Sequence, residues 1–197
     1  MTRLGALGSR LEERLKSRSA TVGVVGLGYV GLPLAVAFAG AGFRVIGVDA
    51  DPVRTALLAG GVSPVEDVPT ARLAPLVRSG RLAIHSSSDA LGEADAIVIC
   101  VPTPLGKSKE PDISFIVAAA DSVARVLRPG GLVVLESTTY PGTTDEVLLP
   151  RLSRGGLRVG EEFFLGFSPE RIDPGNQTWG SPAFPRWWAA SRPRAVI

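Results

Sequence analysis

The sequence has few of the residues that build disulfides and metal sites: one cysteine, Cys100, and one histidine, His85, among 197 residues. A single cysteine excludes an internal disulfide framework, and so small a Cys/His set predicts that no metal is bound. A long apolar run is also missing, since no stretch reaches the roughly 18 residues that a transmembrane helix needs. Residues 1–20 mix acidic with basic side chains and lack a compact apolar segment, unlike a secretory signal. A cytoplasmic protein without a membrane partner fits these absences.

An excess of basic charge is present only near the C-terminal end. The net charge is +2 and the isoelectric point is about 9.0. Residues 181–197 contain three arginines and no acidic residue, so the remainder carries 18 basic and 19 acidic side chains. No basic stripe crosses the main part of the chain, and a nucleic-acid partner is not expected.

Short apolar, β-branched runs alternate with helical stretches along the chain. This alternation predicts an α/β fold in which helices cover both faces of a parallel sheet. Specifically, we expect a doubly wound Rossmann sheet with strand order 3-2-1-4-5-6. The expected strands are 21–26, 44–49, 81–85, 96–101, 132–136 and 162–167, and the expected helices are 31–41, 52–59, 71–79, 114–127 and 143–152, with a short amphipathic helix inside 1–20.

A glycine-rich turn follows the first expected strand and opens the first helix of the sheet. Gly26 allows the tight turn, Gly28 lets a pyrophosphate approach the backbone, and Gly31 lets helix and strand pack closely. Asp49 ends the second strand, 23 residues after Gly26, where a carboxylate accepts hydrogen bonds from the adenosine ribose. Asp49 would also repel a 2′-phosphate, so the pattern favours NAD over NADP. A purely structural glycine turn in another doubly wound fold remains the alternative.

Polar clusters follow three further strands at the edge where such sheets bind ligands. They lie at residues 101–105, 136–139 and 168–171. Thr103 in the first cluster is a candidate to hydrogen-bond cofactor or substrate. Each cluster by itself is equally compatible with an ordinary turn, but three of them are hard to explain as solvated loops.

The chain resembles the N-terminal portion of the UDP-glucose/GDP-mannose dehydrogenase family. Six segments carry the resemblance, in the family's order, over roughly residues 20–180. Two of these segments, ESTTYPGTT and FSPERIDPGN, most resemble those of the bacterial UDP-N-acetylglucosamine 6-dehydrogenases of surface-polysaccharide synthesis. The segments are GLGYVGLPL at 26–34, SPVEDV at 63–68, VPTPL at 101–105, PDISFI at 111–116, ESTTYPGTT at 136–144 and FSPERIDPGN at 167–176.

The resemblance implies a reaction and assigns residues to it. Such enzymes use two NAD and one water to oxidise a sugar C6 alcohol to a carboxylate through a cysteine thioester. Glu170 aligns with a glutamate that assists proton transfer and hydrolysis, and Thr138 with a threonine that helps to order active-site water. Arg54 aligns with a basic residue near the adenosine end of the cofactor, and Thr103 with a contact on the nicotinamide side.

The resemblance also implies that Tyr29 and Val30 of the turn bind the cofactor. Thr138 belongs to the same cofactor-binding set. Full-length members of the family are expected to be homo-oligomers that take a UDP-sugar as substrate. The family's catalytic cysteine lies beyond residue 197, together with the central helix and the sugar-binding domain. Cys100 ends a buried strand and is interpreted as core filling, and His85 as an ordinary edge residue.

The expected organisation is a lead-in at 1–20, the NAD-binding domain at 21–180 and an irregular tail at 181–197. The tail departs from the family pattern. Residues 185–193 can be encoded by codons that give another peptide in a shifted reading frame, the one that begins at the third base of each codon. That peptide is Lys-Val-Val-Gly-Gly-Val-Thr-Pro, which the family commonly carries here. Out-of-frame translation is therefore the favoured interpretation of the tail.

The sequence thus predicts a fragment of an NAD-dependent dehydrogenase that oxidises a UDP-N-acetylhexosamine, first of all UDP-N-acetylglucosamine, in polysaccharide biosynthesis. By itself the fragment is expected to be inactive. Two alternatives stay open: a dehydrogenase of UDP-glucose or UDP-N-acetylmannosamine, and a stand-alone NAD-binding module without catalysis.

Overall fold

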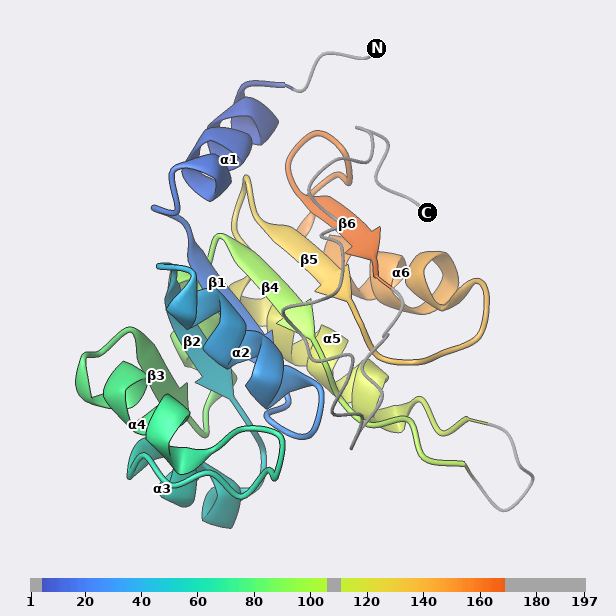
Figure 1. The fold of residues 1–197 in the computed structure, drawn as a ribbon. Coiled ribbons are helices and arrows are strands. Elements are labelled where there is room, and N and C mark those ends of the chain that lie inside the picture. Colours follow the sequence, from blue (N-terminus) through green and yellow to red (C-terminus); the bar gives the residue numbers. More distant parts are fainter. Residues whose placement is uncertain (1–4, 106–110, 169–197) are drawn as a thin grey trace.

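The computed structural model describes residues 5–105 and 111–168, which fold around one six-stranded sheet. All neighbouring strands pair in parallel, in the order β3-β2-β1-β4-β5-β6. This confirms the predicted doubly wound fold and its strand order, with β1 and β4 side by side at the point where the order reverses (Figure 1). The strands are β1 Thr21–Val25, β2 Arg44–Val48, β3 Leu82–His85, β4 Ala96–Ile99, β5 Leu132–Leu135 and β6 Phe164–Phe167.

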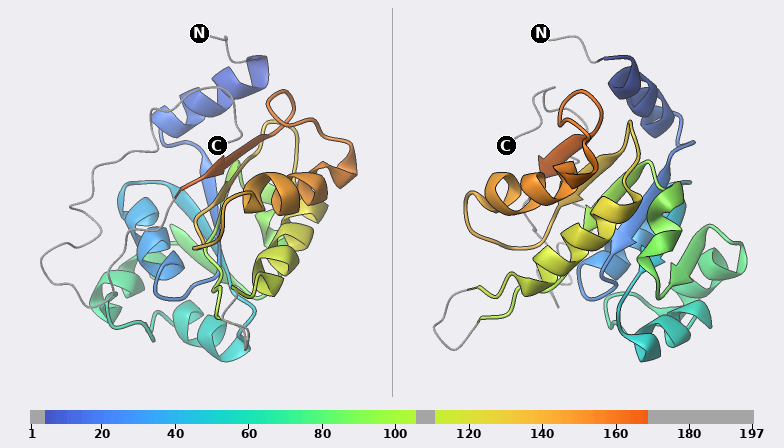
Figure 2. Two further views of the ribbon diagram at one scale, coloured as in Figure 1. Left: turned by 90° about the vertical axis from the view of Figure 1, so that its right-hand side faces the viewer. Right: turned by 180° about the vertical axis from the view of Figure 1, so that it is seen from behind.

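Helices cover both faces of this sheet, as Figure 2 shows from two sides. The helix α2 lies on one face, and α5 and α6 lie on the other. The α-helices are α1 Ala6–Lys16, α2 Gly31–Gly40, α3 Pro52–Ala59, α4 Thr70–Arg78, α5 Ser114–Val126 and α6 Leu149–Leu152; the 3₁₀ helices η1 Ser88–Glu93 and η3 Ser153–Gly155 and the π-helix η2 Thr143–Leu148 complete the set. Among the described residues, no helix is long and apolar enough to cross a bilayer.

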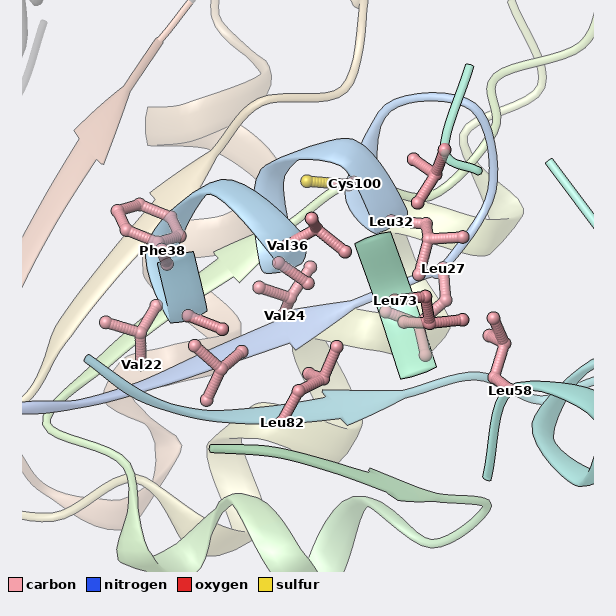
Figure 3. Close-up of a cluster of buried hydrophobic side chains, with 14 of the residues drawn as sticks. Val22, Val24, Leu27, Leu32, Val36, Phe38, Leu58, Leu73, Leu82 and Cys100 are labelled. Carbon is pink, nitrogen blue, oxygen red and sulfur yellow. The ribbon is translucent and has the colours of Figure 1, made fainter. Parts of the chain in front are cut away.

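Two apolar cores lie on opposite faces because successive strand side chains alternate. On the α2 face, Val24 packs in one cluster with Val36 of α2 (Figure 3), and Val98 belongs to the same cluster. On the α5 face, Ile97 and Ile99 pack into the other, together with Ile116 of α5. Every residue of β4 is buried, as expected for a strand covered on both sides. Packing on both faces therefore fixes the strand ends at the carboxyl edge of the sheet.

The helix expected over 143–152 is wrong as a single α-helix. The segment begins after Gly142 (φ +93°), runs as the π-helix η2 and becomes α-helical only at Leu149. Pro150 explains the interruption, because it has no N–H for the carbonyl of Glu146 and its ring would clash with that carbonyl. In η2, which precedes Pro150, π-type hydrogen bonds pair part of the backbone instead.

Smaller differences concern strand ends and the two 3₁₀ helices, η1 and η3. The expected strands ran one or two residues too long at their ends; Cys100 and Val101, for example, lie beyond β4. The 3₁₀ helix η1 was not expected, and the Ser87 hydroxyl caps it by accepting from the Asp89 N–H at 3.2 Å. Its residue Leu91 fills space beside β1 that exists because Gly23 has no Cβ.

Helix α1 is fastened to the amino edge of the sheet by one acidic residue. Asp95, just before β4, accepts a hydrogen bond from the Thr21 N–H at 2.7 Å and forms an ion pair with Arg14 of α1. The other guanidinium nitrogen of Arg14 donates to the carbonyl of Ser19 at 3.1 Å. Helix α1 therefore lies at the amino edge of the sheet, opposite the edge at which the polar clusters follow the strands.

Candidate cofactor-binding site

The turn between β1 and α2 can close only with glycine at two of its positions. Gly26 has φ +88°, and a Cβ there would lie 2.7 Å from the carbonyl oxygen of Cys100. A Cβ on Gly31 would lie 1.7 Å from the carbonyl oxygen of Gly26, which no adjustment of a side chain can relieve. These close approaches let α2 start directly above the end of β1, as the motif predicts.

Gly28 meets a different requirement from Gly26 and Gly31. A Cβ built on it finds no protein atom within 4 Å, so the space beside its backbone is open. Leu27 is completely buried, whereas the neighbouring Tyr29 is 62% exposed. The turn is thus anchored on its inner side and presents bare backbone and one aromatic ring on its outer side.

The N-terminus of α2 faces this open space. Val30 occupies the N-cap, and its apolar side chain cannot accept the first N–H groups of the helix. The first turn of α2 carries no acidic residue. A helix start of this kind favours an anionic ligand, because its amide groups and its macrodipole both point outward. The bare cradle at Gly28 and this helix start fit the pyrophosphate of a dinucleotide.

Asp49 lies directly after β2, beside the turn, and is 6% exposed. Its Oδ2 accepts a hydrogen bond from the Leu27 N–H at 2.7 Å, and its Oδ1 accepts from the Asp51 N–H at 2.9 Å. The backbone N–H of Asp49 donates to the carbonyl of His85 at 3.2 Å and extends the sheet by one residue. These contacts fix the carboxylate at the end of the strand, where the sequence places the ribose.

Arg54 lies over the same carboxylate. Its Nη1 is 3.1 Å from Oδ1 and 3.0 Å from Oδ2 of Asp49, and its Nη2 is 3.9 Å from Oδ2 of Asp51. Asp51 also caps α3, by accepting from the backbone N–H of Val53 and of Arg54. The sequence named Asp49 and Arg54 separately; the structure shows them as an ion pair with a second carboxylate close by.

The clusters after β4 and β5 meet at the carboxyl edge of the sheet. The Thr103 hydroxyl donates a hydrogen bond to the carbonyl oxygen of Thr138 at 2.7 Å. Below them the buried Ser137 hydroxyl donates to the carbonyl of Val101 at 2.7 Å. The sequence grouped Ser137 with the polar cluster at 136–139 as a candidate ligand contact, whereas in the structure its hydroxyl is bonded to the backbone. Two of the three polar clusters therefore form one connected unit.

A thiol and a carboxylate lie beneath this unit. The Cys100 Sγ is 3.9 Å from Oε2 of Glu136, and Cys100 is 6% exposed. The Cys100 Cβ also lies 3.2 Å from the position that a Cβ on Gly31 would take. Cys100 is therefore part of the packing under the dinucleotide turn, and Glu136 was not identified from the sequence as its neighbour.

The segment that enters α5 carries a polar residue of the PDISFI motif. Asp112 accepts a hydrogen bond from the Ser114 N–H at 2.9 Å, and the backbone and side-chain hydrogen bonds with Ser114 lower the pKa of that carboxyl.

Glu170 and the tail at 181–197 lie outside the described residues. Within the described residues, no group of three or more His, Cys, Asp and Glu side chains is placed to hold a metal ion.

Comparison with known proteins identifies the domain that contains the sheet. Residues 20–181 match the model of the UDP-glucose/GDP-mannose dehydrogenase family, NAD binding domain. A UDP-N-acetyl-D-glucosamine 6-dehydrogenase of Pseudomonas aeruginosa is 42% identical over 157 residues, which are 79% of this chain and 36% of the relative. A UDP-N-acetyl-D-mannosamine dehydrogenase of Pyrococcus horikoshii is 38% identical over 157 residues, 78% of this chain and 37% of the relative.

The solved structures agree. The structure of UDP-D-ManNAc dehydrogenase from Pyrococcus horikoshii superimposes with a TM-score of 0.74 at 36% identity, over 79% of this chain and 37% of that one. The chain spans little more than a third of the length of these relatives. The chain belongs to the UDP-glucose/GDP-mannose dehydrogenase family and contains its NAD-binding domain.

Proposed function

We propose that this chain is the cofactor-binding part of a nucleotide-sugar 6-dehydrogenase that oxidises the C6 alcohol of a UDP-N-acetylhexosamine. The observation that carries the proposal is the connected carboxyl edge. There, the open turn at Gly28, the Asp49 carboxylate and the Thr103–Thr138 unit follow neighbouring strands. A dinucleotide laid across β1 and β4 would reach from the first of these to the last.

Several described residues supply groups that would bind and orient the cofactor. Bound NAD would supply the hydride acceptor for oxidation of the sugar carbon. The turn at Gly28 and the start of α2 provide backbone donors for a pyrophosphate, and Asp49 provides acceptors for a ribose. The Thr103 hydroxyl, already held by the carbonyl of Thr138, keeps acceptor capacity for a polar group. We assign Thr138 and Glu170 to the chemical steps, with Glu170 as a proton-transferring group.

UDP-N-acetylglucosamine is the substrate that we propose first. The support is a matching relative named for that sugar at 42% identity, against 38% for one named for UDP-N-acetylmannosamine. This difference is small, so the C2 configuration of the sugar has to be decided by assay. UDP-glucose is the third substrate to compare.

A second candidate is an NAD-binding module without catalysis. The observation in its favour is the position of Cys100, which is the one cysteine of the sequence and is 6% exposed under the turn. A thiolate that forms a thioester has to reach the substrate, and a thiol packed against Gly31 and Glu136 does not. Under this alternative the chain binds NAD and does nothing further.

A domain exchange separates the two candidates. Residues 20–181 would replace the matching region of the Pseudomonas aeruginosa relative, and the chimera would be assayed with NAD and each of the three UDP-sugars. NADH production supports the dehydrogenase proposal, and its loss in Glu170→Gln with retained NAD affinity supports the role of Glu170. A folded chimera that binds NAD but never reduces it favours the non-catalytic module.

A further inference from the structure

The Asp49–Arg54 pair raises a question about cofactor choice, because Arg54 takes the acceptor positions that a ribose would need. A carboxylate offers about four acceptor positions. The N–H groups of Leu27 and Asp51 use one on each oxygen of Asp49. Arg54 Nη1 lies within 3.1 Å of both oxygens and uses the remaining capacity.

The geometry of the pair makes the guanidinium displaceable. One nitrogen, Nη1, is shared between the two oxygens of Asp49, whereas the strong arrangement uses two nitrogens in parallel. Within the described part of the chain, the one ion pair of Nη2 is with Asp51, at 3.9 Å, and the Arg54 side chain is 36% exposed. Arg54 can therefore leave the oxygens to ribose hydroxyls and still remain beside them, because its backbone is fixed in the first turn of α3.

We propose that Arg54 is a specificity-determining residue, and that the Asp49–Arg54 pair rather than Asp49 alone sets the preference for NAD over NADP. The proposal rests on the NAD-binding function above and deepens it. Asp49 holds a cation that would otherwise attract a 2′-phosphate. Without the charge of Asp49, the site contains the arginine that NADP-binding relatives of this fold place near the ribose.

The charges around the ribose position support this assignment. Asp49 and Asp51 contribute two negative charges, and Arg54 contributes one positive charge within 4 Å of both. With all three present, a 2′-phosphate meets a net negative surface. Neutralising Asp49 leaves Arg54 opposed only by Asp51 at the longer distance, which favours a phosphate that Arg can bind through two nitrogens.

The test is direct binding of NAD and NADP to the 197-residue chain by calorimetry. Asp49→Asn should bind NADP about tenfold or more tightly than the wild type does, while its NAD affinity falls. The double variant Asp49→Asn/Arg54→Gln should lose that gain. The gain should also shrink as salt is added, because it is electrostatic.

A second arm leaves Asp49 and its backbone hydrogen bonds in place. Arg54→Gln should raise the ratio of NAD affinity to NADP affinity about fivefold or more, because the 2′-phosphate of NADP then meets two unopposed carboxylates, whereas NAD loses only a contact near its adenosine end. Arg54→Lys keeps the positive charge but not the planar two-nitrogen contact, so it should restore part of the NADP binding that Arg54→Gln loses. The matched control is Arg44→Gln, which removes the exposed Arg44–Glu93 ion pair at the other end of β2 and should change neither affinity.

Two results would overturn the proposal: equal NADP affinity in Asp49→Asn and the double variant, or an unchanged NADP-to-NAD ratio in Arg54→Gln. A wild-type chain that binds NAD normally alongside either result contradicts the role of Arg54 only. A wild-type chain that binds no NAD contradicts the proposed function itself, and the role of Arg54 with it.

Discussion

The hydroxyl of Thr103 donates a 2.7 Å hydrogen bond to the carbonyl oxygen of Thr138, and this bond joins the segment after β4 to the segment after β5. The two residues are 35 positions apart in the sequence and follow neighbouring strands of the sheet. Because Ser137 ties the same two segments together from below, the polar edge behaves as one structural unit.

Thr103→Val should weaken this unit. The substitution keeps the shape of the side chain and removes its donor, so we expect the free energy of unfolding to fall by about 1 kcal/mol. Thr103→Ser keeps the hydroxyl and is the control, with an expected loss of less than half of that. Urea denaturation of the two variants measures the difference; equal midpoints would show that the hydrogen bond contributes nothing to stability.

Two glycine substitutions in the turn should have opposite signatures. Gly28→Ala places its methyl group in open space, so we expect a normal melting temperature and weaker NAD binding, because the methyl occupies the approach to the backbone. Gly31→Ala drives a methyl into the carbonyl of Gly26, so we expect the melting temperature itself to fall. Thermal unfolding and calorimetry on both variants check this. Wild-type NAD affinity in Gly28→Ala would argue against a pyrophosphate at this turn.

The 197-residue chain should bind NAD without catalysing turnover. Cys100 is buried beneath the turn, and the family's nucleophile is expected outside these residues. Incubation with NAD and each UDP-sugar should therefore produce no NADH above the background. Cys100→Ala is the matched variant, and its background should be identical. Steady NADH production by wild type that disappears in Cys100→Ala would identify Cys100 as the nucleophile and contradict our interpretation.

Removal of residues 181–197 should leave NAD affinity unchanged. If this segment is translated out of frame, it has not been selected to support the domain, and its deletion should only remove three positive charges. Calorimetry of the shortened chain measures the affinity. A weaker NAD affinity of the shortened chain would assign the segment a role in binding. Resequencing of the gene tests the frameshift itself, and a stop codon within a few codons of the shifted frame would argue against it.

The sequence by itself determined the elements and the turn. Alternating strands and helices with apolar, β-branched strands are sufficient to predict a covered parallel sheet, because each pattern reflects local burial. The spacing from Gly26 to Asp49 predicted a dinucleotide turn, and the structure shows why glycine is needed there: Gly26 has φ +88°, and a Cβ on Gly31 would clash with the carbonyl oxygen of Gly26. Pro150 was visible too, yet its effect on the helix around it was not anticipated.

Only the tertiary structure decided which of the polar residues act together. The Thr103–Thr138 bond depends on the register between β4 and β5 and on the rotamer of one hydroxyl, and neither is encoded locally. The shared carboxylate of Asp49 depends in the same way on Arg54 turning back from the first turn of α3 over the end of β2. Side-chain partners are set by packing between distant segments, so a sequence pattern can name these residues but cannot show how they pair.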